Sequence, residues 1–135
     1  MKSAYFNCIG GASGDMLLGA LIDAGLDIQK LTSYVDMLGI GGYSIEPKKS
    51  SRGAINGTHV TVKLPSRSEG ANTINDFRMM LGNSNLPSSV VSDCSRVLEG
   101  LEAAEEAVHG TNADLHELGS LDTIIDIVGV VSGLE

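Results

Sequence analysis

The stretch that most constrains the fold covers residues 5–21, because it joins an apolar run to a glycine-rich turn and a helical pattern. The run at 4–9 is short and apolar, as is typical of a covered β-strand. Three glycines between positions 10 and 14 can take positive φ and let another backbone or a ligand approach closely. Ser13 is a favourable N-cap residue. The stretch therefore predicts a buried strand, a tight turn and a helix that starts at Ser13.

A glycine-rich turn at a helix N-terminus is a recurring anion-binding geometry. This turn matches neither the dinucleotide fingerprint nor the P-loop, and no lysine follows it. Asp15 would repel a bare phosphate, but it would tolerate one bridged by a divalent cation or bind the cation itself. The alternative is a purely structural turn in which Asp15 only favours the helix start. Spacing alone leans to that alternative.

Charge and cysteine content exclude several classes of function. The net charge of −8 argues against nucleic acids and anionic membranes as partners. Cys8 and Cys94 are the two cysteines, without a C-x-x-C motif, so neither a disulfide scaffold nor a thiolate zinc site is indicated. We expect both thiols to be buried in a reducing cytoplasm. No apolar run reaches the roughly 20 residues of a membrane span.

The remaining pattern predicts an α/β fold in which a small mixed sheet of about three strands is packed by about five helices. The same elements also allow an α+β arrangement. The 135 residues are expected to form one domain. A basic, solvated loop is expected at 48–53, and His59 is expected to be exposed on a strand. The expected helices cover 15–24, 28–38, 74–81, 87–109 and a segment from about 121, and the expected hairpin pairs 43–47 with 55–64.

Two aspartates interrupt the apolar run near the end of the chain. Ser120 predicts a helix cap there, although the β-branched run would equally suit a buried strand. On a helix, Asp122 and Asp126 share one stripe with Gly129 and Gly133. Two carboxylates one turn apart in an apolar helix need a cation, an arginine or backbone donors as partners. The glycines would let another element approach that stripe.

His116 and Glu117 come just before this helix start. An imidazole with nearby carboxylates is a plausible site for a first-row divalent ion, with His116, Asp122 and Asp126 as candidate ligands. The alternative is that His116 and Glu117 make local capping hydrogen bonds and that Asp122 is only a first-turn acid. Spacing gives the two interpretations equal weight.

Four stretches, taken together, resemble the nickel-insertion proteins that complete the nickel-pincer nucleotide cofactor of lactate racemase. The resemblance stays in register over nearly the whole chain, and its first and last motifs are long and specific. The stretches are Tyr5–Cys8 with Gly11–Gly25, Arg52–Thr58, Val108–Gly110 and His116–Gly129.

The resemblance implies a nickel insertase of the lyase class. Such a protein places nickel in a pyridinium bis-thiocarboxylate mononucleotide, forming a carbon–nickel bond flanked by sulfur ligands, and CTP is hydrolysed with manganese or magnesium. Carried onto this chain, it implies metal ligands, catalytic residues and residues near the mononucleotide phosphate. These are, respectively, His116, Asp122 and Asp126; Asp15 and Glu117; and Gly11, Ser13 and Gly14, with His109 as a weaker candidate.

The chain also departs from the family pattern. Asn7 stands where the family usually has aspartate, and residues 66–70 lack the usual histidine-rich segment. Family members are much longer, so residues 1–135 are expected to be the N-terminal part of such a protein. The expected partners are then a C-terminal domain or partner subunit, with self-association through an exposed apolar end.

Two other classes of function remain open from the sequence. One is a non-catalytic assembly domain whose acidic helix and last segment dock a partner. The other is a metal-dependent phosphate-ester enzyme that uses Asp15, Asp122 and Asp126 as ligands. Metal binding by the isolated chain would separate the first class from the others.

Overall fold

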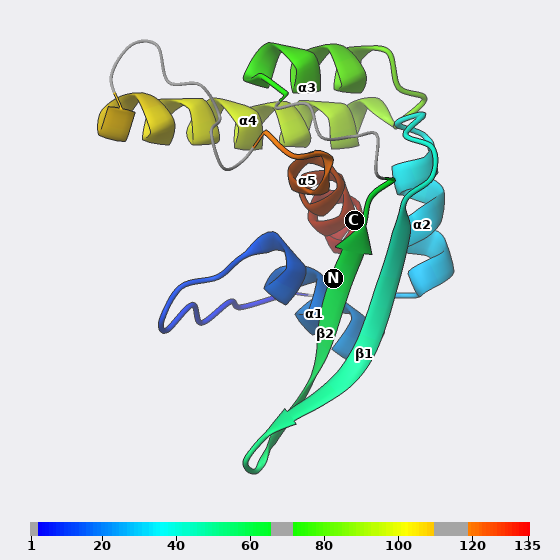
Figure 1. Cartoon of the computed structure of the whole chain (residues 1–135), viewed down its shortest axis with the longest axis vertical. Helices are drawn as coiled ribbons and strands as arrows, with labels where there is room; N and C mark the ends of the chain where they lie inside the picture. The colour runs from blue at the N-terminus through cyan, green and yellow to red at the C-terminus, as the bar shows by residue number, and fades with distance from the viewer. Residues whose placement is uncertain (1–2, 66–71, 110–118) are drawn as a thin grey trace.

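The computed structural model describes residues 3–65, 72–109 and 119–135 (Figure 1). Within these ranges the chain forms five helices and one two-stranded antiparallel sheet. The mixed α/β class is confirmed, but the described sheet has two strands where three were expected. The elements are α1 (Gly14–Asp23), α2 (Ile28–Asp36), β1 (Ser44–Arg52), β2 (Ile55–Lys63), α3 (Ile74–Gly82), α4 (Ser88–His109) and α5 (Leu121–Leu134).

Helix α5 runs through the middle of the fold and contacts α1, α2, α4 and β2 (Figure 1). Its buried residues Ile124, Ile125 and Val128 join a core cluster with side chains from α2, α3 and α4. The β-branched run forms a helix because its burial among other helices outweighs its intrinsic strand propensity. Apolar as α5 is, no helix in the described ranges is long and apolar enough to cross a membrane.

The glycines of α5 bring α1 and α2 close to it. A Cβ atom on Gly129 would lie 2.9 Å from side-chain atoms of both Leu18 and Leu31. A Cβ atom on Gly133 would lie 2.9 Å from Leu26. Such distances are too short for carbon–carbon contacts, so these positions need glycine unless the leucines move. The expectation that the glycine stripe admits another element is thus confirmed.

Helix α1 also lies against β2 with its backbone in contact with the strand. A Cβ atom on Gly19 would lie 2.1 Å from the backbone oxygen of Thr58. Val60 of β2 is buried beside this contact, in a small cluster with Leu18 and Leu31. Because the obstacle at Gly19 is backbone rather than a flexible side chain, α1 can hold this position only with glycine there.

The hairpin of β1 and β2 is longer than the sequence indicated. Its register pairs Ser44 with Lys63 at one end and Arg52 with Ile55 at the other. Residues 48–52, expected in a solvated loop, are the second half of β1, and the turn is confined to residues 53 and 54. The polar composition was misleading because these residues pair across the strands without needing burial. The hairpin projects from the rest of the molecule (Figure 1).

The apolar run 4–9 is not a strand, which corrects the expectation from the sequence. Every residue from 3 to 13 is exposed, with Tyr5 90% and Ile9 86% accessible to solvent. Cys8, expected to be buried, is exposed as well. A strand needs neighbouring backbone groups for its hydrogen bonds, and the described sheet offers this segment none. An apolar run alone does not supply a partner.

Candidate functional site

The turn before α1 has the predicted conformation. Gly10 and Gly11 have φ values of 85° and 96°, and the Gly11 N–H donates to the Cys8 carbonyl at 3.1 Å. Ser13 is extended and directly precedes the helix, as expected, but its hydroxyl makes no capping bond. That hydroxyl instead donates to the Asp15 carboxylate. The first backbone N–H groups of α1 are therefore not satisfied by the Ser13 side chain.

Asp126 of α5 approaches the N-terminus of α1 at Gly14. A Cβ atom on Gly14 would lie 2.5 Å from both Cβ and Oδ2 of Asp126, so the glycine makes room for this carboxyl group. A backbone hydrogen bond from Asp15 favours the charged form of Asp126. The positive end of the α1 dipole favours that form as well. The first and last motifs of the sequence thus meet in space.

The carboxyl group of Asp126 is poorly neutralised. Its pKa is raised to about 7, mainly by burial and also by the negative charges of Asp15 and Asp122, while the backbone hydrogen bond from Asp15 lowers it. Its buried Oδ1 atom has no hydrogen-bond partner among the described residues. A buried oxygen without a partner costs free energy. A proton, a hydrogen-bond donor or a cation at Asp126 Oδ1 would therefore stabilise the folded protein.

Asp15 and Asp122 complete an acidic group around Asp126. Asp122 Oδ1 accepts a hydrogen bond of 2.9 Å from the Thr123 N–H at the start of α5. Among the described residues, no group of three or more His, Cys, Asp or Glu side chains is arranged to hold a metal ion. The three aspartates therefore influence one another electrostatically without forming a complete coordination site.

A pocket of about 400 Å³ opens between the first turn of α1 and the hairpin. Asp15 lies on its wall, so it continues the acidic group described above. We name it the hairpin pocket. It is lined by Asp15, Met16, Ser50, Arg52, Ile55, Gly57, Thr58 and His59. Sequence reasoning missed its hairpin wall, because residues 48–53 were interpreted as a loop; the Arg52–Thr58 motif was the available signal.

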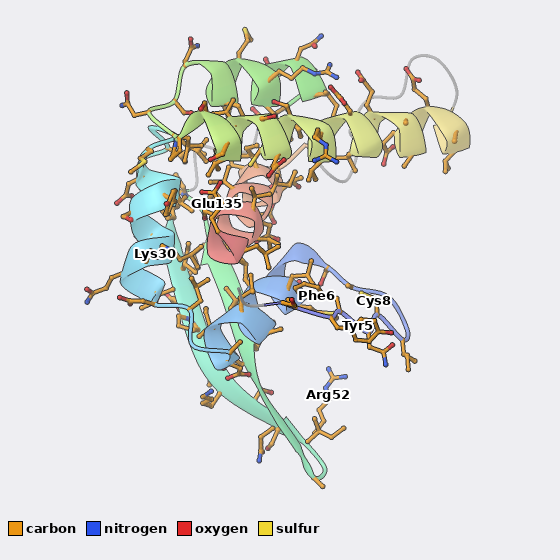
Figure 2. The ribbon with its side chains drawn as sticks, turned by 180° about the vertical axis from the view of Figure 1, so that it is seen from behind. Tyr5, Phe6, Cys8, Lys30, Arg52 and Glu135 are labelled. Carbon is orange, nitrogen blue, oxygen red and sulfur yellow. The ribbon has the colours of Figure 1, made fainter. Side chains whose placement is uncertain are left out.

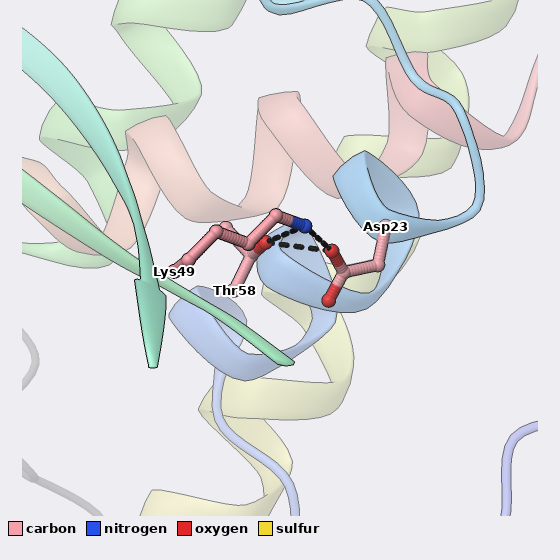
Figure 3. A network of polar contacts seen from close by, with 3 residues as sticks. All are labelled: Asp23, Lys49 and Thr58. Carbon is pink, nitrogen blue, oxygen red and sulfur yellow. Dashed lines mark hydrogen bonds and ion pairs between the residues drawn. The ribbon is translucent and has the colours of Figure 1, made fainter. Parts of the chain in front are cut away.

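A polar network fixes the C-terminal end of α1 to the hairpin (Figure 3). The ammonium group of Lys49 donates to Asp23 and, at 3.0 Å, to Thr58 Oγ1, and Thr58 Oγ1 donates to Asp23 at 2.7 Å. These bonds hold the pKa of Asp23 below its usual range, with the bond from Lys49 as the largest cause. Thr58, a member of this network, also lines the hairpin pocket.

A protein-family model described as "Nickel insertion protein" matches residues 4–135. The chain belongs to the nickel insertion protein family. The match covers the N-terminal turn, the hairpin and α5, which are the elements that build the site described above.

Relatives in this family carry names that refer to nickel insertion. One from Roseiflexus castenholzii is 41% identical over 97% of this chain and 34% of its own length. One from Desulfitobacterium hafniense, named pyridinium-3,5-bisthiocarboxylic acid mononucleotide nickel insertion protein, is 38% identical over 98% of this chain and 34% of its own. The chain therefore spans about a third of the length of the curated relatives it matches. No solved structure matches it.

The structure brings together part of the site predicted for this nickel insertion family member. Asp15, Asp122 and Asp126 lie within electrostatic reach of one another, with Gly14 in contact with Asp126. Gly11 and Ser13 precede them in the turn. Three candidates lie outside the described residues: His116, Glu117 and the side chain of His109. The roles of all these residues stay predictions.

Proposed function

We propose that this chain takes part in inserting nickel into the pyridinium-3,5-bisthiocarboxylic acid mononucleotide. The observation that carries the proposal is the carboxyl group of Asp126, which lies beside Asp15 and Asp122 with one oxygen unpartnered in the described structure. The name of the Desulfitobacterium hafniense relative supplies the substrate. Nickel is here a substrate that passes through the site, not a resident cofactor.

The donor types suit a transient nickel site. Carboxylate and imidazole ligands bind first-row divalent ions, and they are harder than the thiocarboxylate sulfur that receives the metal. Transfer of nickel from these oxygen and nitrogen ligands to the sulfur atoms is therefore favourable, because nickel also accepts soft ligands. We propose His116, Asp122 and Asp126 as nickel ligands and Glu117 as a catalytic residue. Bound nickel would also supply the missing partner of Asp126 Oδ1.

The turn before α1 is proposed to face the mononucleotide. Gly11 and Gly14 allow close approach of a ligand, and Ser13 offers a hydroxyl beside the positive end of the helix. Asp15 lines the hairpin pocket, where it can contact either the substrate or a cation bound to it. Its proposed catalytic role is to orient these groups next to Asp126.

Further properties of the whole protein are proposals too. They comprise hydrolysis of CTP with manganese or magnesium, a cytoplasmic setting, a C-terminal domain or partner subunit, and self-association. The described residues form no complete site for a resident divalent ion. The two free cysteines, one of them exposed, accord with a reducing compartment.

Titration calorimetry with nickel chloride tests the proposal on this chain. The wild type should bind with a roughly micromolar Kd or tighter, and Asp126→Asn and His116→Ala should each weaken binding about tenfold or more. Glu99→Gln is the matched control, because it removes one exposed carboxylate from α4, away from the site. Equal affinity of Asp126→Asn and wild type would make Asp126 structural. Absence of binding together with concentration-dependent size would favour the assembly-domain function.

A further inference from the structure

The hairpin pocket is lined by an arginine, Arg52, that has no ion-pair or hydrogen-bond partner among the described residues. Of the seven described lysines and arginines, four pair with a carboxylate and Lys30 lies over the Tyr34 ring. In the described ranges Arg52 and Lys48, both on β1, are the two cations with neither an ion pair, a hydrogen bond nor a ring contact. In a chain with a net charge of −8, carboxylate partners are abundant, so an unpaired arginine lining a pocket points to an external anion.

The register of the hairpin places further donors beside Arg52. Ser50 lies two residues before it on β1, so both side chains belong to the same face of the strand. His59 follows two residues after Gly57, which is directly opposite Ser50, so the imidazole belongs to this face too. Since Gly57 has no side chain, the face leaves space beside the guanidinium, the hydroxyl and the imidazole, and a Cβ atom on Gly57 would lie 3.8 Å from Asp23 Oδ2. Figure 2 shows Arg52 extending from the hairpin on the side of the segment that carries Tyr5 and Cys8.

Apolar side chains line the hairpin pocket on both of its walls. Met16 comes from α1 and Ile55 from β2, where it pairs directly with Arg52; they are 63% and 77% exposed, so both side chains are free to cover the face of a planar ring. Asp15 adds a carboxylate on the α1 wall. The pocket thus offers a cation, hydrogen-bond donors and the Ile55 side chain at the hairpin, and a carboxylate with the Met16 side chain at α1. That layout fits a ligand that carries a phosphate at one end and a positively charged ring at the other.

We propose that the hairpin pocket binds a pyridinium mononucleotide. Arg52, with Ser50 and His59, holds its phosphate, and its ring lies against Met16 and Ile55 with the positive charge near Asp15. This deepens the proposed function, on which it rests for the identity of the ring. It separates the two substrates in space, because the nickel ligands gather around Asp126 while the phosphate is held by the hairpin.

Calorimetry with nicotinic acid mononucleotide, a simple pyridinium mononucleotide, tests the proposal. The wild-type chain should bind it, and Arg52→Gln should weaken binding about tenfold or more because a charge-assisted contact to phosphate is lost. Arg96→Gln removes the same charge from the exposed face of α4 and should leave the affinity unchanged. Both variants should keep the wild-type melting temperature, because both side chains are exposed.

Three related ligands identify what the hairpin pocket recognises. The riboside, which lacks the phosphate, should not bind, and cytidine monophosphate, whose ring is neutral, should bind about tenfold more weakly than the pyridinium mononucleotide. If inorganic phosphate bound as tightly as the mononucleotide, the proposed contacts with the ring would be wrong. No binding of the mononucleotide, or equal binding by Arg52→Gln, would overturn the proposal. These titrations contain no nickel, and nickel binding is titrated separately, so failure of this inference is distinguishable from failure of the nickel site.

Discussion

The two ends of α1 each meet an aspartate, and the two carboxylates are held differently. At the C-terminal end, Asp23 accepts hydrogen bonds from Lys49 and Thr58, which lower its pKa (Figure 3). At the N-terminal end, Asp126 is half-buried, has an unpartnered oxygen and has a pKa raised to about 7. The same chemical group is therefore ion-paired where it only joins two elements, and has one unpartnered oxygen where two family motifs meet.

The contrast separates a structural contact from a binding function. Folding alone gains nothing from an unpaired carboxylate, because its desolvation is not offset by a partner. Asp23 stabilises the position of the hairpin without any ligand. Asp126 costs stability at neutral pH, which is expected of a residue that a metal ion or another ligand completes. Substitutions that alter the contacts at one end of α1 at a time can test this difference.

The largest effect is expected from Gly19→Ala, which should displace α1 and so disturb the contacts at both of its ends. Its new Cβ atom would overlap the backbone oxygen of Thr58, so α1 must move away from β2. We expect a loss of about 3 kcal/mol or more in the free energy of unfolding, at the upper end of overpacking effects. Chemical denaturation measures it.

Gly100→Ala is the control for this substitution. Gly100 lies within α4 and has open space around it, so alanine should stabilise the protein by about 0.5–1 kcal/mol through its higher helix propensity. A loss below about 1 kcal/mol for Gly19→Ala would mean that α1 does not lie against β2 as described.

Asp126→Asn should stabilise the metal-free chain, with an effect that depends on pH. The folded-state pKa of Asp126 lies above the ordinary value of 3.8, so stability is highest when the group is protonated and falls as pH rises from about 4 to about 7. After discounting for partial exposure, we expect a gain of about 1–3 kcal/mol at pH 8 and little gain at pH 4. Urea denaturation across this pH range measures the change.

Asp23→Asn should change the stability in the opposite direction to Asp126→Asn, because it removes a carboxylate that is paired in the folded protein. The lowered pKa of Asp23 means that its contribution is present above pH 4 and is lost as pH falls through the folded-state pKa. Asp23 is exposed, so its effect should be smaller than that of Asp126 and should weaken with added salt. Stabilisation by Asp23→Asn at pH 8, or destabilisation by Asp126→Asn there, would contradict the proposed difference between the two carboxylates.

The same contrast shows what the sequence could predict. Helix α2 follows from local signals, because Asp27 accepts the capping bond from the Gln29 N–H at 2.9 Å. Ser120 precedes α5 as expected, but the β-branched run equally suited a strand, and its burial among other helices decides for the helix. The aspartate and glycine stripe of α5 also follows from its spacing. Its partner does not, because the contact between Gly14 and Asp126 joins residues far apart in the chain. Periodicity identifies a face but not the element that covers it.

The two errors have a shared physical cause. The run 4–9 was predicted as a strand because it is apolar, and residues 48–52 were predicted as a loop because they are polar and basic. Strands are defined by backbone pairing, which depends on a neighbour rather than on burial. The hairpin turn supplies residues 48–52 with a partner, whereas the described sheet supplies none to 4–9. The hairpin pocket was missed for the same reason, since its wall is this paired segment.

The smallest effect concerns the two thiols, which report on the N-terminal segment without changing stability. Cys8 is exposed, whereas Cys94 is buried in α4, where desolvation raises its pKa to about 12. Because the thiolate is the reactive form, Cys8 should react with a thiol reagent within minutes and Cys94 only after unfolding. In Cys8→Ser, fast labelling should therefore disappear. If Cys8 were instead protected until the protein unfolds, residues 4–9 would be covered in solution, as the apolar pattern had predicted.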